Sequence, residues 1–185
     1  MPLFDQLTLH TDRLLLRPLR EGDAPALFEI FSDPKVMRYW STPPWASIEQ
    51  AHAVIAEDKR GLAAGDYLRL GIERTGDGQL IGVCSLFSLS EQCRRAEVGY
   101  ALATAASGRG FMHEALTALL DHAFLDLDLN RIEADIDPRN TASARCLARL
   151  GFKQEGHLRE RWIVNGEISD SIIYGLLRSE WRAKT

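Results

Sequence analysis

The sequence predicts an α+β (mixed α/β) domain built around a mostly antiparallel sheet, and three observations lead to this prediction. Apolar residues recur every three or four positions over 21–33, alternate over 67–102, and return to helical spacing from 112 onward. The first spacing is typical of amphipathic helices and the alternation of half-buried strands. Gly76-Asp77-Gly78 separates two alternating runs, which indicates a β-hairpin. No linker or repeat interrupts the chain, so we expect one domain over residues 1–185.

The N-terminal part of the chain predicts one strand followed by two helices. Residues 12–19 read as a strand that ends near a proline, because proline donates no hydrogen bond to a sheet. Residues 21–33 have helical spacing, and Pro34 closes that helix. The aromatic and proline-rich stretch 39–45 predicts a stiff loop. Residues 48–62 predict the second helix, with Gly65 beyond its end.

The remainder of the chain predicts a meander followed by alternating helices and strands. The apolar stripe from Met112 to Leu127 is the most regular amphipathic pattern in the sequence. Asn140 and Gly151 bracket a shorter helix, with glycine in the position of a left-handed cap. The expected elements are strands at 67–74, 80–88 and 95–102, a helix at 112–127, a strand at 131–136, a helix at 140–150, and strands at 153–164 and 168–177.

Composition excludes several classes of protein. The chain has 185 residues, 45% of them hydrophobic and 26% charged, which is typical of a globular protein and not of a disordered one. A net charge of −4 argues against direct nucleic-acid binding, because that affinity comes largely from Lys and Arg on phosphates. No uninterrupted apolar run is long enough for a membrane span, so no membrane partner is expected.

Cysteine and histidine usage adds two expectations. Cys84, Cys93 and Cys146 are odd in number and form no C-x-x-C pair, which favours a reducing, cytoplasmic location over a disulfide framework. The 5 histidines show no metal-ligand spacing, so no metal is expected.

The segment from Glu97 to Leu116 carries the clearest chemical signal. A strand leads into a loop with Gly108 and Gly110, and the loop opens the most amphipathic helix of the chain. Helix N-termini bind anions through unpaired N–H groups, and glycine lets the backbone approach a phosphate closely. Arg109 adds a cationic fork, so a pyrophosphate fits this loop. An ordinary strand-to-helix turn is the alternative, and the pattern matches neither a P-loop nor a dinucleotide fingerprint.

The same run resembles motif A of the GNAT superfamily of acetyl-CoA-dependent N-acetyltransferases. That motif, Gln/Arg-x-x-Gly-x-Gly/Ala, aligns on residues 107–112, with Ser107 and Met112 departing from it. Further similarity to the RimJ/RimL branch (the ribosomal-protein-alanine N-acetyltransferase type) lies in Asn140-Thr-Ala-Ser143, Leu150-Gly151-Phe152, Asn165-Gly166 and the N-terminal Thr11–Pro18. The resemblance covers nearly the whole chain. It implies the GNAT fold, with a splayed sheet of six to seven strands and about four helices.

The resemblance also implies how acetyl-CoA, the acyl donor, is bound. The strand before motif A is expected to pair with the pantetheine arm, and the glycine loop with the pyrophosphate. Asn140 is expected to hold the pantetheine arm, although capping the helix that follows is its ordinary role. The donor-binding residues so implied are Val98, Tyr100, Ala101, Leu102, Ser107, Gly108, Arg109, Gly110, Phe111, Met112, Asn140 and Ser143.

The implied reaction is direct attack of a primary amine on the thioester in a ternary complex. Ser143 aligns with the hydroxyl that protonates the leaving thiolate in RimL-like enzymes, with helix capping as its alternative role. Trp162 stands where those enzymes have an acid, which leaves Glu97 as the candidate base. A carboxylate that merely faces solvent is the alternative for Glu97. His157 and Glu160 are weaker candidates.

The acceptor is open at this stage, either a protein N-terminal α-amine or a small-molecule amine. Trp40, Trp45 and Trp162 are expected to wall its pocket, although a buried aromatic corner is an equally simple reading of the first two. A homodimer is implied by the family. Two other hypotheses stand beside the enzyme: a CoA-binding sensor or scaffold of the same fold that has lost catalysis, and a phosphate-ligand domain unrelated to CoA.

Overall fold

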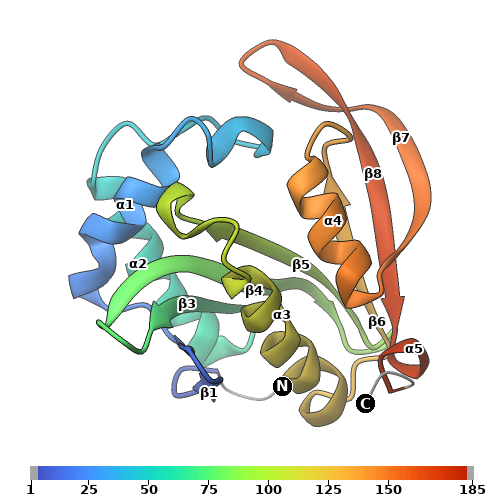
Figure 1. The fold of residues 1–185 in the computed structure, drawn as a ribbon, viewed down its shortest axis with the longest axis horizontal. Coiled ribbons are helices and arrows are strands. Elements are labelled where there is room, and N and C mark those ends of the chain that lie inside the picture. The colour runs from blue at the N-terminus through green and yellow to red at the C-terminus, as the bar shows by residue number, and fades with distance from the viewer. Residues whose placement is uncertain (1–3, 183–185) are drawn as a thin grey trace.

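The computed structural model describes residues 4–182, and its eight strands form one sheet of order β1-β2-β3-β4-β5-β6-β8-β7 (Figure 1). Seven neighbouring pairs make up this sheet, and only β5 and β6 run parallel. The strands are β1 (Leu9–His10), β2 (Leu14–Arg17), β3 (Leu68–Arg74), β4 (Gln79–Ser90), β5 (Arg95–Leu102), β6 (Arg131–Ile136), β7 (Lys153–Val164) and β8 (Glu167–Leu177).

Five α-helices and four shorter helical turns complete the fold. The α-helices are α1 (Ala24–Ser32), α2 (Glu49–Ala64), α3 (Phe111–Asp121), α4 (Thr141–Leu150) and α5 (Arg178–Arg182). The turns are the 3₁₀ segments η1 (Glu21–Asp23), η2 (Met37–Tyr39) and η3 (Thr104–Ala106), and the π-helical η4 (His122–Asp126).

The sheet carries a separate hydrophobic core on each face. Leucines of β2 and β3 pack with the apolar stripes of α3 and α4 in the larger core. The smaller core joins α1 and α2 to Val83 of β4 and Ala101 of β5. Hairpin β7–β8 extends beyond both layers, and its outer residues are largely exposed (Figure 1). The part of the sheet near β3 and β4 therefore lies between helices, whereas hairpin β7–β8 at the other edge is largely uncovered.

The parallel pair β5–β6 is short and then splays. Its register covers Arg95–Glu97 of β5 against Arg131–Glu133 of β6 and goes no further. Beyond Glu97, β5 continues to Leu102 along β4, and β6 continues to Ile136 along β8. The two strands thus separate while each keeps its outer neighbour (Figure 1). This confirms the splayed, mostly antiparallel sheet that the family resemblance implied.

The structure corrects several details of the sequence analysis. The sheet has eight strands rather than six or seven, because the two-residue β1 is too short to leave a pattern of alternation. The predicted helix at 112–127 leaves α-geometry at His122 and finishes as a π-turn. The predicted strand at 12–19 shortens to Leu14–Arg17, and α5 was not predicted. The hairpin turn at Gly76–Gly78 and the left-handed caps Gly65 and Gly151 are confirmed.

A buried ion cluster ties α1 to the sheet. Arg17 of β2 is 3% exposed and binds Asp23, with Nη1–Oδ2 at 2.7 Å and Nη2–Oδ1 at 2.9 Å. Its Nε also donates to Glu73 of β3 at 2.6 Å. Burial by itself raises the pKa of Asp23, but the hydrogen bonds from Arg17 and from the Arg20 N–H outweigh it and lower that pKa. The cluster fixes where η1 and α1 start above β2 and β3.

Arg17→Met is expected to lower the free energy of unfolding at pH 7 by about 3–5 kcal/mol, because it leaves two shielded carboxylates without their cation. Since the pKa of Asp23 is lower in the folded state, its contribution is present at neutral pH and is lost as the pH falls through that value. Urea unfolding at pH 7 and in acid measures this difference, which should shrink in acid.

The matched control is Arg74→Met, because Arg74 pairs with the exposed Asp77 on the surface. Surface pairs contribute less than about 1 kcal/mol, so this variant should stay near the wild type. An equal, small loss in both variants would mean that the Arg17 cluster does not anchor α1.

Candidate functional site

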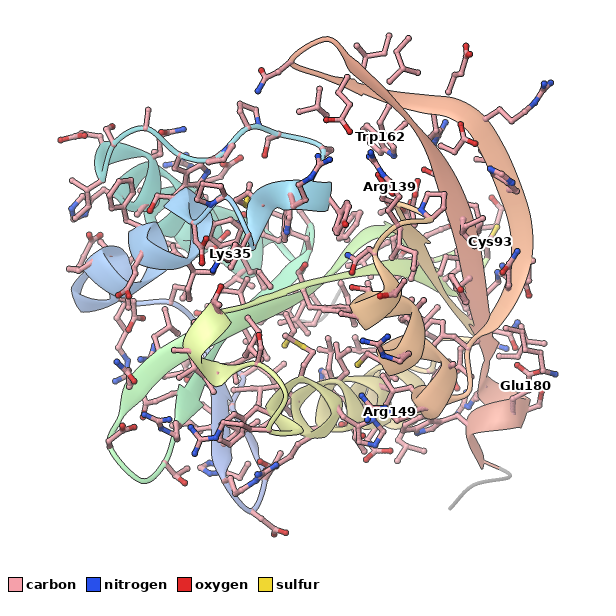
Figure 2. All side chains as sticks on the ribbon, turned by 45° about the horizontal axis from the view of Figure 1, so that its top comes forward. Lys35, Cys93, Arg139, Arg149, Trp162 and Glu180 are labelled. Atoms are coloured by element: carbon pink, nitrogen blue, oxygen red, sulfur yellow. The ribbon has the colours of Figure 1, made fainter. Side chains whose placement is uncertain are left out.

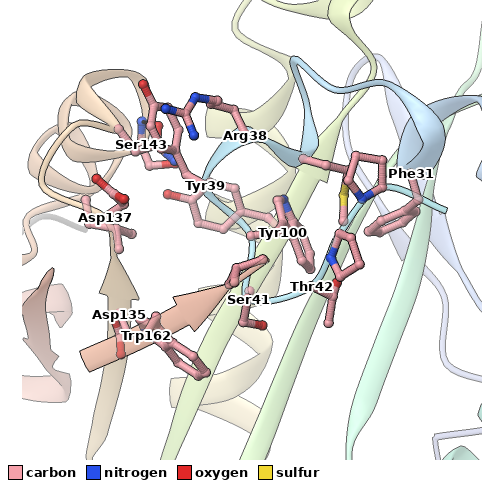
Figure 3. Close-up of a pocket in the computed structure, with 18 of the residues that line it drawn as sticks. Phe31, Arg38, Tyr39, Ser41, Thr42, Tyr100, Asp135, Asp137, Ser143 and Trp162 are labelled. Carbon is pink, nitrogen blue, oxygen red and sulfur yellow. Dashed lines mark hydrogen bonds between the residues drawn. The ribbon is translucent and has the colours of Figure 1, made fainter. Parts of the chain in front are cut away.

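A pocket of about 990 Å³ opens where β5 and β6 diverge. Side chains reach it from η2, β5, β6, α4 and β7, as Figure 3 shows for Tyr39, Tyr100, Asp135, Ser143 and Trp162. The carboxyl ends of both parallel strands meet here, which is where ligands bind in open parallel sheets.

The pocket brings together half of the predicted residues from distant parts of the chain. Both catalytic candidates and all three tryptophans line it: Glu97, Ser143, Trp40, Trp45 and Trp162, together with Val98, Tyr100 and Asn140. Ala101 lies instead in the core under α1, and Leu102 packs against the core of α3. The loop Ser107–Met112 lies outside the pocket lining, at the start of α3. His157 and Glu160 do not line the pocket, and His157 pairs with Asp170 at 2.7 Å.

The splay creates an open place for an extended ligand. The residues of β5 after Glu97 have partners on β4 but none on β6. Main-chain groups left without a partner in a sheet are readily completed by an added strand-like chain. An arm with alternating amides therefore fits between β5 and β6.

The loop before α3 is shaped for an anion. Gly108 and Gly110 have φ of 76° and 81°, and nothing lies within 4 Å of where a Gly108 Cβ would be. The first main-chain bond of α3 runs from the Glu114 N–H to the Gly110 carbonyl, so the N–H groups of Phe111 and Met112 have no acceptor within the helix. The dipole of an eleven-residue helix adds positive potential there.

Two arginines flank this loop. The guanidinium carbons of Arg13 and Arg109 lie 4.6 and 5.1 Å from the centre of the Phe111 ring. Arg13 is held by Glu114, with Nε–Oε2 at 2.7 Å, and also donates to the Arg109 carbonyl at 3.2 Å. The loop thus presents cationic side chains on an aromatic support, as a phosphate site requires.

Tyr100, Asn140 and Ser143 face each other across the splay between β5 and α4. The Asn140 side chain accepts the Ser143 N–H at 3.1 Å, which confirms that it caps α4. The Tyr100 hydroxyl is buried without a hydrogen bond of normal geometry among the described residues. Burial raises the pKa of Tyr100, and the nearby Ser143 hydroxyl offsets part of that effect. A buried hydroxyl of this kind is completed by a polar ligand atom.

Two carboxylates line the pocket close to the point of divergence. The side-chain carboxylate of Glu97 has no hydrogen bond or ion pair within residues 4–182. Asp135 of β6 lies two positions beyond Glu133, the register partner of Glu97, and its side chain is 19% exposed. Its nearest cation is Arg161, with Nε–Oδ2 at 3.8 Å. Both groups are therefore available to a cation or a proton.

A bridge of charges joins the two sides of the pocket. Glu167, at the start of β8, pairs with Arg139 at 2.6 Å and with Arg38 of η2 at 3.1 Å. Arg139 also binds the buried Asp137, and it is the main cause of the lowered pKa of that carboxyl. Both guanidinium carbons lie within 6 Å of the centre of the Tyr39 ring. Figure 2 shows Arg139 between α4 and the hairpin that carries Trp162.

Aromatic rings form the wall opposite hairpin β7–β8. Phe31 stacks on Trp45 at 4.6 Å between ring centres and meets Trp40 edge-on at 5.2 Å. Trp40 and Trp45 thus form an aromatic corner with Phe31 and also line the pocket. Trp162 is 40% exposed and follows an irregularity in β7 between Leu158 and Trp162. Such bulges turn side chains toward a site.

Sequence reasoning missed Asp135, Asp137 and Arg139, and also Arg69 and Tyr39. A signal existed for Asp137 and Arg139, because both lie between the end of a strand and the capping Asn140. Arg69 lies within an alternating strand, and nothing local distinguishes it from a surface residue.

Two searches of the described residues gave no candidate. No group of three or more His, Cys, Asp or Glu side chains in residues 4–182 is arranged to hold a metal ion. None of the helices in that range combines the length and the hydropathy needed to cross a bilayer.

Comparisons with known proteins agree with this geometry. A family model described as the acetyltransferase (GNAT) domain matches residues 13–153. The "uncharacterized N-acetyltransferase p20" of Bacillus licheniformis is 36% identical over 174 residues, covering 94% of this chain and 98% of that protein. The [ribosomal protein uS5]-alanine N-acetyltransferase of Escherichia coli (strain K12) is 25% identical over 185 residues, covering 95% of this chain and 93% of that one.

A solved structure gives the same result in three dimensions. The spermidine N-acetyltransferase from Vibrio cholerae, in complex with CoA and spermine, has a TM-score of 0.82 and 25% identity to this chain. The match covers 93% of this chain and 99% of that one.

Proposed function

Because the chain belongs to the GNAT family of N-acetyltransferases, whose donor is acetyl-CoA, we propose that it transfers acetyl directly to a primary amine held in the pocket between η2 and hairpin β7–β8. The observation that carries the proposal is the splay of β5 from β6, which opens a donor slot directly into an acceptor pocket. The acceptor is a small-molecule amine or a protein N-terminus. The three-residue limit of the parallel register, Arg95–Glu97, defines where the slot begins.

The donor is assigned to two adjoining regions. In this proposal the pyrophosphate binds the glycine loop, at Gly108, Gly110 and the N-terminus of α3, and Arg109 contributes its positive charge. The pantetheine amides pair with the free edge of β5, from Val98 to Leu102. This arrangement delivers the thioester to the end of β5 near Tyr100 and Ser143, because those residues flank the gap and line the pocket.

Proton movement is assigned to groups that lie on either side of that point. Nucleophilic attack requires a neutral amine, and Glu97 is an unpaired carboxylate in the pocket that can accept its proton, directly or through water. The amine nitrogen then forms a bond to the carbonyl carbon and the carbon–sulfur bond breaks. Ser143 gives its proton to the sulfur, and its oxygen takes up the remaining proton of the amine nitrogen, directly or through water. The proposed donor to the developing oxyanion is a main-chain N–H of β5 in the Val98–Tyr100 stretch.

Direct attack is favoured over an acetyl-cysteine intermediate. Burial raises the pKa of Cys84 to about 12 and also raises the pKa of Cys146, so both thiols are protonated and poorly nucleophilic at neutral pH. Cys93 is exposed at the β4–β5 turn and does not line the pocket. A ternary complex therefore needs no covalent step on the protein.

Gly110→Glu is expected to weaken acetyl-CoA binding at least about tenfold, because it places a carboxylate beside the phosphates at the N-terminus of a helix. Isothermal titration with acetyl-CoA, with ATP and NAD as comparison ligands, measures the loss. The matched control is Gly78→Glu, since Gly78 has a similar φ of 68° on an open hairpin turn. Equal losses in the two variants, or tighter binding of ATP or NAD, would contradict the donor site.

Glu97→Gln is expected to lower kcat about a hundredfold while acetyl-CoA affinity stays unchanged, because general-base catalysis contributes roughly 10²–10⁴. Thiol release from acetyl-CoA with a panel of amines gives kcat and KM. Glu57→Gln, an exposed position on α2, serves as the control. A variant that retains full kcat would remove Glu97 from the mechanism. Turnover by the wild type with any amine would dismiss the alternative of a catalytically silent CoA sensor.

A further inference from the structure

Arg69 of β3 lines the pocket, yet the transfer chemistry proposed above does not use it. It pairs in register with Ser85 of β4, which in turn pairs with Gly99 of β5. Neighbouring strands lie about 4.8 Å apart, so the main chains of β3 and β5 are separated by roughly 10 Å in this row. Arg69 thus lies on the side of the pocket away from the splay.

Buried groups hold the Arg69 guanidinium in place. Its Nη1 donates to Asp58 Oδ1 of α2 at 2.7 Å, and the Tyr67 hydroxyl donates to the same oxygen at 2.8 Å. The guanidinium carbon lies 5.4 Å from the centre of the Tyr67 ring. Asp58 is 1% exposed, and its second oxygen has no partner among the described residues. Removing a carboxylate from water in this way costs free energy, so the buried pair is weak evidence for a gain in stability.

A glycine in the last turn of α2 makes room for this arrangement. A Cβ at Gly61 would lie 2.3 Å from Tyr67 Cε1, so any side chain would displace the ring. Glycine within a helix costs roughly 0.5–1 kcal/mol relative to alanine. Asp58 and Gly61 therefore both depart from what stability alone favours, and together with Tyr67 they fix one orientation of Arg69.

The rest of the guanidinium is directed to the cavity. The Arg69 side chain is 33% exposed, and within residues 4–182 its only hydrogen bond goes to Asp58. Its other N–H donors are open to a ligand. Planar guanidinium donors match a carboxylate in two parallel hydrogen bonds. Val54 and Phe87 also line the pocket, which adds apolar surface to it.

The opposite side of the pocket has the opposite charge. Gly99 has no side chain there, and the Phe87 ring lies 3.1 Å from where its Cβ would be. Beyond Gly99 the strands part, and Glu97 and Asp135 line the far side of the pocket. The floor thus carries a cation at β3 and carboxylates at β5 and β6.

We infer that the acceptor is an amine that also carries a carboxylate, with Arg69 binding the carboxylate while Glu97 and Asp135 face the amine. This inference rests on the transferase function proposed above and narrows its substrate class to amino acids in which an apolar segment of several bonds separates the amine from the carboxylate. A polyamine offers only cations to this floor and leaves the open donors of Arg69 without an acceptor. Such unpaired donors disfavour an analogue that lacks the matching group.

Matched acceptors isolate this interaction. 6-Aminohexanoic acid and 8-aminooctanoic acid are compared with their amides, and spermidine is included, with thiol release from acetyl-CoA as the readout. Arg69→Gln is expected to raise KM for the free acids at least about tenfold, with kcat little changed, because it removes a charge-assisted pair. KM for the amides should change less than twofold. Comparing each variant with the wild type cancels the different reactivities of the amines.

Two further variants keep the test decisive if Arg69→Gln folds poorly. Arg69→Lys keeps the charge but loses the fork, so its loss on the free acids should be intermediate. Arg60→Gln, at an exposed position of α2, is the control and should match the wild type on every acceptor. Titration of the free acids into the CoA-bound protein provides a binding readout that does not depend on turnover.

The outcomes separate the inference from the function on which it rests. Two results would overturn the carboxylate site and leave the transferase intact. One is a rise in KM that is equal for acids and amides in the Arg69 variants. The other is a wild type that uses amides or spermidine but neither binds nor acetylates the free acids. A wild type that binds acetyl-CoA but releases no thiol with any amine would overturn the transferase, and the inference with it.

Discussion

The separation of β5 from β6 is the constraint on which the rest of this molecule depends. Two parallel strands that pair over three residues and then part leave main-chain groups without partners at the centre of a sheet. Such groups are costly unless water or a ligand completes them. The fold tolerates the break because each strand keeps a full antiparallel neighbour, β4 on one side and β8 on the other. The cost is local, and the result is a slot that reaches from the start of α3 to the pocket.

Charges organise what lies around that slot. Arg17 anchors α1 to β2 and β3, and α1 in turn brings Phe31 to the aromatic wall. Arg139 and Arg38 meet Glu167 across the pocket, so the loop of η2 and hairpin β7–β8 are joined by ion pairs at the protein surface. Exposed pairs of this kind contribute little stability, and the two walls can therefore separate at modest cost when a substrate enters.

Much of the fold follows from local pattern, whereas the pocket follows from topology. The amphipathic stripe of α3, the caps at Gly65 and Gly151 and the turn at Gly76–Gly78 are each determined within a few residues, and the sequence predicts them. Strand β1 has two residues and leaves no periodicity to find. The π-turn at His122 could not be predicted either, because the apolar stripe continues through it although the hydrogen bonding changes.

The site divides in the same way. Glu97, Ser143 and the glycine loop could be found because they lie in or beside a recognisable motif. Asp135 and Arg69 could not, since their importance comes from strands that are distant in sequence and adjacent in space. Arg69 alternates with buried leucines like any residue on the polar side of a strand, and only Asp58 and Gly61 of α2 reveal that its orientation is fixed.

Hydrogen exchange of the β5 amides, followed by NMR with and without acetyl-CoA, tests the central claim most directly. The account predicts that the alternate N–H groups of residues 98–102 that point away from β4 exchange quickly in the free protein and become protected when acetyl-CoA is bound. Amides that already bond to β4 should change little. Protection confined to the loop before α3, with the β5 amides unaffected, would show that the slot between the two strands is not where the donor binds.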